Sequence, residues 1–158
     1  MLTLGDAGAT EALGAQLAAI VRGGDAIALV GELGAGKTTF VSGLTAALGA
    51  GGAHSPTFSL VHEYVGDRLI VWHIDLYRIE RESELIELGI EDFVGDPRGI
   101  AVVEWADKFA VLPKDHLRLE LRHSQRGRKV IAIGTGPRGR ALAAGLDPGG
   151  SFTPLDER

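Results

Sequence analysis

The stretch GELGAGKT, residues 31–38, decides the fold of this chain. It follows an apolar run, DAIALVG (25–31), that predicts a buried strand, and it leads into KTTFVSGLTAAL (37–48), whose apolar residues have helical spacing. A phosphate-binding loop requires this order of strand, glycine-rich loop and helix. The stretch matches G-x-x-x-x-G-K-[ST] at the four required positions, which are Gly31, Gly36, Lys37 and Thr38.

Each required residue type has a physical reason. Glycine lets the backbone pass close to a phosphate without a Cβ clash. The amide groups of the loop and the positive end of the following helix then face the anion. Lys37 is placed to reach the β- and γ-phosphates, and the Thr38 hydroxyl is a Mg²⁺ ligand. The loop therefore predicts a nucleotide, ATP or ADP, bound with Mg²⁺.

The elements around the loop predict an α/β fold, a single-domain P-loop NTPase with a mixed central β-sheet flanked by helices. Residues 1–136 form the ATPase domain, and the Gly- and Pro-rich residues 137–158 are expected to be a weakly ordered tail. Further helices are expected at 6–22 and 82–88, and further strands at 58–65, 68–75, 99–105, 116–123 and 128–134. The first two and the last two of these strands are expected to pair as hairpins.

Composition narrows the class of protein. The chain has 158 residues, 45% of them hydrophobic, and a formal net charge of −5, which disfavours a broad nucleic-acid-binding face. The absence of cysteine excludes disulfides, thiolate nucleophiles and cysteine-ligated zinc. No apolar run approaches the ~20 residues of a membrane span, and no secretory signal opens the chain. We expect a cytoplasmic protein without a membrane contact, in which the basic segment RHSQRGR (122–128) leaves only a small RNA contact open.

Two carboxylates end apolar strands and are candidates for the metal site. Asp75 ends RLIVWHID, and a P-loop site needs such a carboxylate to position Mg²⁺ directly or through water. A helix N-cap or turn role is the less favoured alternative for Asp75. Glu104 ends the 99–105 strand and is a candidate to orient water or metal-bound water. Trp105 either stacks near the base or packs at the sheet edge.

The sequence favours ATP over GTP. The chain contains no asparagine, so the Asn-Lys-x-Asp signature of guanine readers is missing, and Arg78 stands where a switch glycine is expected. Two alternatives to an ATPase stay open. One is a small-molecule kinase with 122–128 as its lid, although the flanking β patterns favour a basic hairpin turn there. The other is a nucleotide-gated binding module in which hydrolysis is not essential.

Four motifs, GELGAGKTTF, SPTFSLVHEY, HIDLYR and VEW, in this order and spacing, resemble the TsaE (YjeE) family over about residues 6–134. These are small bacterial P-loop ATPases of tRNA threonylcarbamoyladenosine biosynthesis. The resemblance implies ATP binding with weak intrinsic hydrolysis that a partner stimulates. It also implies joint work with TsaD and TsaB, which transfer the threonylcarbamoyl group to adenosine 37 of tRNA. The tRNA itself would then touch this chain indirectly or through a small contact at residues 122–128.

The resemblance also implies roles for particular residues. Lys37, Asp75 and Glu104 would be catalytic, and Thr38, Asp75 and Glu104 would hold the metal. Thr57, with Ser55, would sense the γ-phosphate. The nucleotide-binding set would be Glu32, Leu33, Gly34, Ala35, Gly36, Lys37, Thr38, Thr39, Thr57 and Trp105. His54, His62 and His73 lack the spacing of metal ligands, and His73 is expected to buttress the site. The role of Arg78 stays open: its side chain could pair with a carboxylate, contact phosphate or contact a partner protein.

Overall fold

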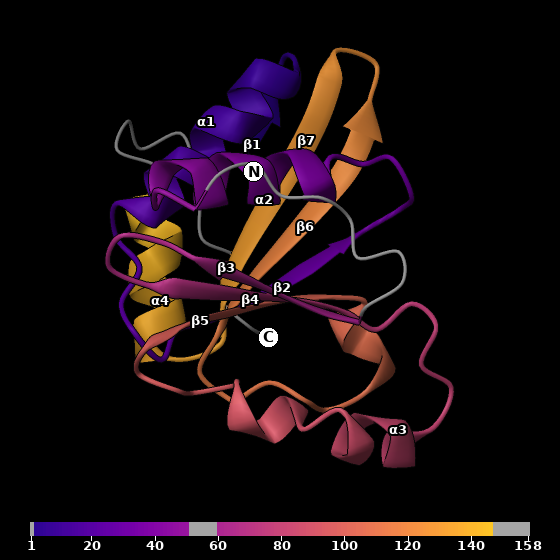
Figure 1. The fold of residues 1–158 in the computed structure, drawn as a ribbon. Coiled ribbons are helices and arrows are strands. Elements are labelled where there is room, and N and C mark those ends of the chain that lie inside the picture. The colour runs from indigo at the N-terminus through magenta and orange to yellow at the C-terminus, as the bar shows by residue number, and fades with distance from the viewer. Residues whose placement is uncertain (1, 51–59, 147–158) are drawn as a thin grey trace.

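The computed structural model describes residues 2–50 and 60–146, which form one seven-stranded mixed sheet in the order β1-β7-β6-β2-β5-β4-β3 (Figure 1). The strands are β1 (Leu2–Leu4), β2 (Ala26–Gly31), β3 (Val61–Val65), β4 (Ile70–Asp75), β5 (Gly99–Glu104), β6 (Leu117–Ser124) and β7 (Gly127–Gly134). The α-helices are α1 (Ala7–Ala18), α2 (Lys37–Ala47), α3 (Glu82–Glu87) and α4 (Pro137–Gly145), and the short 3-10 turns are η1 (Ile90–Asp92) and η2 (Ala106–Lys108).

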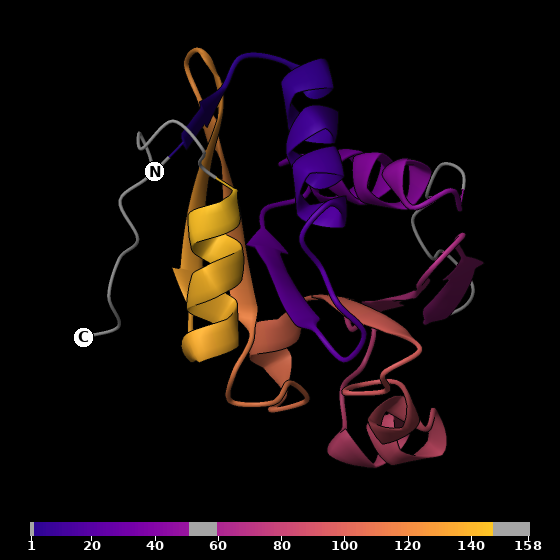
Figure 2. The same cartoon turned by 90° about the vertical axis from the view of Figure 1, so that its left-hand side faces the viewer.

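The sheet carries helices on both faces, as the sequence predicted. Helices α1 and α2 lie above it and α3 lies below it, while α4 runs beside β6 and β7 (Figures 1 and 2). Along β5, Val102 packs into the larger core with α1, α2 and α4, and the next residue, Val103, packs into the smaller core with α3. Side chains of a strand alternate between faces, so one strand supplies both cores.

Strand pairing places the phosphate-binding loop at the centre of the sheet. Strand β2 pairs in parallel with β5 on one side and with β6 on the other. Strand β5 also pairs in parallel with β4, so β2, β5 and β4 end at the same edge. Both predicted hairpins are confirmed, because β3 pairs antiparallel with β4 and β6 with β7. Within the described residues, no helix is both long and apolar enough to cross a bilayer.

The expectation of a weakly ordered tail from residue 137 is wrong for residues 137–145, which form α4. Pro137 suits the first turn of a helix, where its missing N–H costs nothing. Leu142 and Ala143 are buried in the larger core. This helix has only a short apolar pattern, and its contacts lie far away in the sequence. Residues 147–158 lie outside the described residues.

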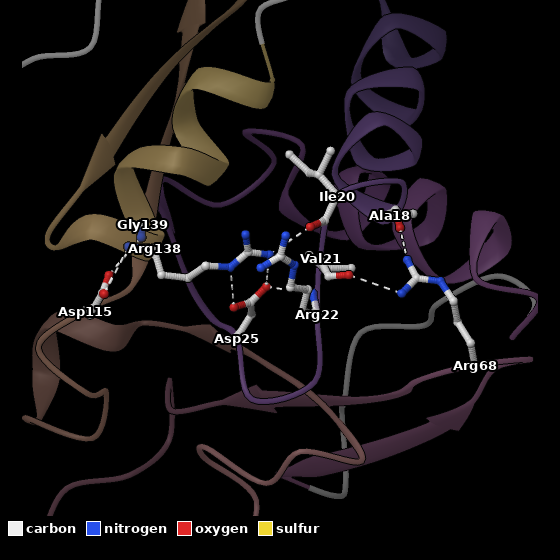
Figure 3. Close-up of polar contacts among 9 residues, drawn as sticks. All are labelled: Ala18, Ile20, Val21, Arg22, Asp25, Arg68, Asp115, Arg138 and Gly139. Carbon is white, nitrogen blue, oxygen red and sulfur yellow. Dashed lines mark hydrogen bonds and ion pairs between the residues drawn. The ribbon is translucent and has the colours of Figure 1, made fainter.

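Polar contacts fix α4 against the start of β2 (Figure 3). Arg138 donates from Nε and Nη2 to the Asp25 carboxylate at 2.9 and 2.7 Å, and from Nη2 to the Ile20 carbonyl at 2.8 Å. Asp115 accepts hydrogen bonds from the backbone N–H groups of Arg138 and Gly139 at the start of the helix. These bonds lower the pKa of the Asp115 carboxyl. The network therefore orders α4 from its N-terminal turn.

A second arginine closes the end of α1 in the same region (Figure 3). Arg68 donates to the Val21 carbonyl at 3.1 Å and to the Ala18 carbonyl. The last carbonyls of a helix lack intrahelical donors, so a guanidinium there satisfies them and complements the helix dipole.

Candidate functional site

The phosphate-binding loop joins β2 to α2, as the sequence predicted. Gly34 and Gly36 have φ values of +78° and +105°, a backbone conformation that residues with a side chain rarely adopt. Lys37, the first residue of α2, is only 7% exposed. Its Nζ donates to the Gly31 carbonyl at 2.5 Å and lies 4.7 Å from the centre of the Trp105 ring. The lysine is therefore held at the mouth of the loop.

Most predicted site residues line one cavity of about 520 Å³ above this loop. The cavity is lined by Leu33, Gly34, Gly36, Lys37, Thr38, Thr39, Asp75, Tyr77, Arg78, Glu104, Trp105 and Arg128. Glu32 instead lines a neighbouring cavity of about 570 Å³, which shares Lys37 and Trp105 with the first. Ala35, within the loop, is fully buried. Thr57, Ser55 and His54 lie outside the described residues.

The two candidate carboxylates are direct neighbours. Asp75 ends β4 and pairs in register with Glu104, which ends β5. The pKa of Asp75 is raised, chiefly by burial and also by the charge of Glu104, while the hydrogen bond from the Tyr77 backbone N–H at 3.0 Å opposes the shift. Two carboxylates held together in a partly buried site favour a bound cation.

A buried histidine holds one of these carboxylates. His73 Nε2 donates to Glu104 Oε2 at 2.7 Å, and the two side chains are 0% and 5% exposed. The other ring nitrogen of His73, Nδ1, is buried without a hydrogen-bond partner among the described residues. His73 therefore fixes the orientation of Glu104, in agreement with the buttressing role expected from the sequence.

The donor set suits a magnesium ion bound together with a nucleotide. Thr38 lines the same cavity as Asp75 and Glu104, so a hydroxyl and two carboxylates face one space. Mg²⁺ in nucleotide sites takes one or two protein carboxylates and completes its octahedral shell with water and phosphate oxygens. These residues fit that requirement.

Comparisons with known proteins agree with this geometry. A family model described as threonylcarbamoyl adenosine biosynthesis protein TsaE matches residues 4–130. The chain belongs to the TsaE family. The tRNA threonylcarbamoyladenosine biosynthesis protein TsaE of Bacillus subtilis is 38% identical over 117 residues, which are 73% of this chain and 72% of that protein. The TsaE protein of a Nostoc species is 35% identical over 134 residues, 82% of each chain.

The fold of a solved relative is also similar. A crystal structure of Bacillus subtilis YdiB matches with a TM-score of 0.73 and 29% identity, covering 90% of this chain and 89% of that one. The fold predicted from the sequence and its TsaE resemblance are thus both confirmed.

Trp105 has an unusual backbone conformation for a residue with a side chain. Its φ is +60°, the one positive value outside glycine among the described residues. Its ring lies 5.1 Å from the Tyr77 ring and packs partly against the smaller core. A strained backbone at a site is held in place by its surroundings. Trp105 therefore lies in the site next to Lys37, and base stacking stays a prediction.

Two arginines, Arg78 and Arg128, also line this cavity. Arg78 is exposed and makes no hydrogen bond or ion pair with the described residues, so its role stays open. Arg128 was not among the predicted nucleotide-binding residues, because the sequence favoured a basic hairpin turn at 122–128, with a kinase lid as the alternative. Its Nη2 donates to the Gly34 carbonyl at 3.1 Å. No local sequence signal marks this contact, which depends on β6 lying beside β2.

Proposed function

We propose that this chain binds ATP with Mg²⁺, hydrolyses it slowly on its own, and supports threonylcarbamoyl modification of adenosine in tRNA. The observation that carries the proposal is one cavity lined by Lys37, Thr38, Asp75 and Glu104. The names of the relatives supply the pathway, tRNA threonylcarbamoyladenosine biosynthesis. The partners proposed from the family are TsaD and TsaB, which carry out the transfer itself in the cytoplasm.

The chemistry asked of the protein is positioning and charge stabilisation. Lys37 and the amides at the start of α2 stabilise negative charge on the β- and γ-phosphates. Thr38 and Asp75 would hold Mg²⁺, which would neutralise developing charge on the phosphates. Glu104, oriented by His73, positions the attacking water. Hydrolysis stays slow until a partner completes the stabilising groups or orders the site.

Two variants test the site assignment. Lys37→Ala should abolish ATP binding, because the lysine is the principal cation of the loop. Asp75→Ala should keep ATP binding and lose Mg²⁺-dependent hydrolysis. Lys114→Ala removes an exposed lysine outside the site and is the matched control. Equilibrium binding of a fluorescent ATP analogue and phosphate release give the two readouts. Unchanged turnover in both site variants would refute the assignment.

The same Asp75→Ala variant tests whether hydrolysis matters to the pathway. In a reconstituted modification reaction with TsaD, TsaB and tRNA, it should fail to sustain repeated turnover although ATP still binds. Full modification through many turnovers would instead show that ATP occupancy alone regulates the complex. A pull-down with and without ATP then asks whether TsaD and TsaB bind in a nucleotide-dependent manner.

A further inference from the structure

A cavity of about 650 Å³ lies at the opposite end of α2 from the phosphate-binding loop. Its walls come from the last turns of α1 and α2, the β3–β4 turn and α4. Three arginines, Arg22, Arg68 and Arg138, line it, and among the described residues no carboxylate does. The cavity shares no lining residue with the nucleotide site, so it is a separate feature of the molecule.

Two of the arginines are held in place by backbone carbonyls. Arg138 reaches the end of α1 from α4, and Arg68 reaches it from the β3–β4 turn (Figure 3). Arg138 donates to the Ile20 carbonyl at 2.8 Å, and Arg68 donates to the Val21 carbonyl at 3.1 Å. Arg138 Nη1 and Arg68 Nε make no hydrogen bond with any residue that the structure describes. Each guanidinium therefore has a fixed orientation and keeps N–H groups for a ligand.

The three guanidinium groups leave positive charge uncompensated in this cavity. Arg138 pairs with the Asp25 carboxylate at 2.7 Å. The side chain of Arg22 is exposed and makes no hydrogen bond or ion pair in the described part of the chain, and Arg68 donates to carbonyls alone. The carbonyls at a helix end carry only partial negative charge, so one carboxylate and a helix end face three full positive charges. An anion bound in the cavity would reduce the repulsion among them.

The composition of the cavity favours an organic phosphate as that anion. Guanidinium groups bind phosphate and carboxylate through paired N–H groups. A phosphate monoester presents three oxygens and a charge of about −1.5 to −2 at pH 7, which suits three arginines better than a single carboxylate does. A cavity of this volume holds more than a bare phosphate. Small apolar residues supply a wall for the organic part, namely Ala15, Ala19, Ala47 and Ala141.

We propose that this cavity is a second ligand site, in which Arg22, Arg68 and Arg138 bind the phosphate group of a small organic phosphate. The inference goes beyond the proposed function and does not rest on it, because no residue of the nucleotide site takes part. Arg68 and Arg138 then have a role besides closing the end of α1 and holding α4.

The test measures binding of ribose 5-phosphate, inorganic phosphate and ribose by isothermal calorimetry, with excess Mg²⁺ and ADP to fill the phosphate-binding loop. Ribose 5-phosphate should bind the parent at least several-fold more tightly than inorganic phosphate, and ribose should not bind. Arg22→Met should weaken ribose 5-phosphate about tenfold, the typical effect of losing a charged hydrogen bond. Its Tm should not change, because the Arg22 side chain makes no hydrogen bond or ion pair with the described residues.

Two further variants separate charge from geometry. Arg22→Lys keeps the charge and loses the paired donors, so its affinity should lie between those of the parent and Arg22→Met. Arg140→Met removes an exposed arginine of α4 that does not line the cavity, and it should match the parent. Adding Arg68→Met to Arg22→Met should weaken ribose 5-phosphate further, to beyond the range of the measurement.

Several outcomes would overturn the inference. They are no binding of either phosphate to the parent, equal affinity in Arg22→Met and Arg140→Met, or no preference for ribose 5-phosphate over inorganic phosphate. An RNA oligonucleotide that binds through Arg22 when ribose 5-phosphate does not would assign the arginines to an RNA surface instead. Failure of the proposed function looks different, because ADP would then not bind, while dependence on Arg22 would still assign the phosphate to this cavity.

Discussion

Replacing Arg138 with methionine tests how α4 is held, because it keeps the length of the side chain and removes the guanidinium. Among the described residues, the Asp25 carboxylate, 6% exposed, would keep only the backbone N–H of Arg22 as a donor. Removing one partner of a buried ion pair costs about 3–5 kcal/mol. Arg138 is itself 28% exposed, so water replaces part of the lost interaction and we expect about 2 kcal/mol. For a domain of this size that lowers Tm by about 4–8 °C.

Thermal unfolding followed by circular dichroism measures the change. Arg140→Met removes an exposed arginine from the same helix and should alter Tm by no more than about 1 °C. Adding Asp25→Asn to Arg138→Met should recover part of the loss, because the buried charge is then gone. ATP affinity should not change, since Asp25 precedes β2 and the phosphate-binding loop follows it. If Arg138→Met has the same Tm as Arg140→Met, the ion pair contributes nothing to stability and apolar packing alone holds α4.

Three further experiments probe the loop and the site. Gly36→Ala demands a φ of +105° from alanine and should cost about 1–2 kcal/mol and weaken ATP binding, measured by calorimetry, whereas Gly5→Ala, with nothing within 4 Å of its Cβ, should do neither. The pKa of Asp75 is raised by burial, so its ionisation opposes folding at a pH above that pKa. In melts without nucleotide, Asp75→Asn should therefore be more stable than the parent at pH 8, and the gain should vanish as the pH falls toward 3.8. The chain has two tryptophans, and Trp72 is buried at 1% exposure. Nucleotide-dependent fluorescence should accordingly survive Trp72→Phe and disappear in Trp105→Phe.

The parts of the fold that local patterns encode could be predicted. The loop GELGAGKT lies between a strand and a helix within one residue of the expected boundaries. Helix α4 was missed, because its apolar side is short and glycine-rich, and its order comes from Arg138 meeting Asp25, 113 positions away in the chain. Periodicity cannot reveal a helix whose order depends on contacts with residues distant in the chain.

The site divides in the same way. Asp75 and Glu104 could be paired from the sequence, since both end apolar strands and parallel strands present their carboxyl ends at one edge. The contact of Arg128 with the loop could not, because it requires the predicted hairpin of β6 and β7 to lie beside β2. Strand order is a property of the whole chain, and nothing in RHSQRGR encodes it.

Several features of the site oppose stability in the free protein. Asp75 is placed beside Glu104, which together with burial raises the pKa of Asp75. Trp105 adopts a left-handed backbone, and Lys37 is buried against a carbonyl and an aromatic ring. A bound Mg²⁺-nucleotide would supply a cation to the carboxylates and anionic oxygens to the lysine. The free energy that the fold gives up here is regained on binding, so nucleotide and folding stability are linked, and the protein should melt at a temperature that rises with ATP and Mg²⁺ concentration.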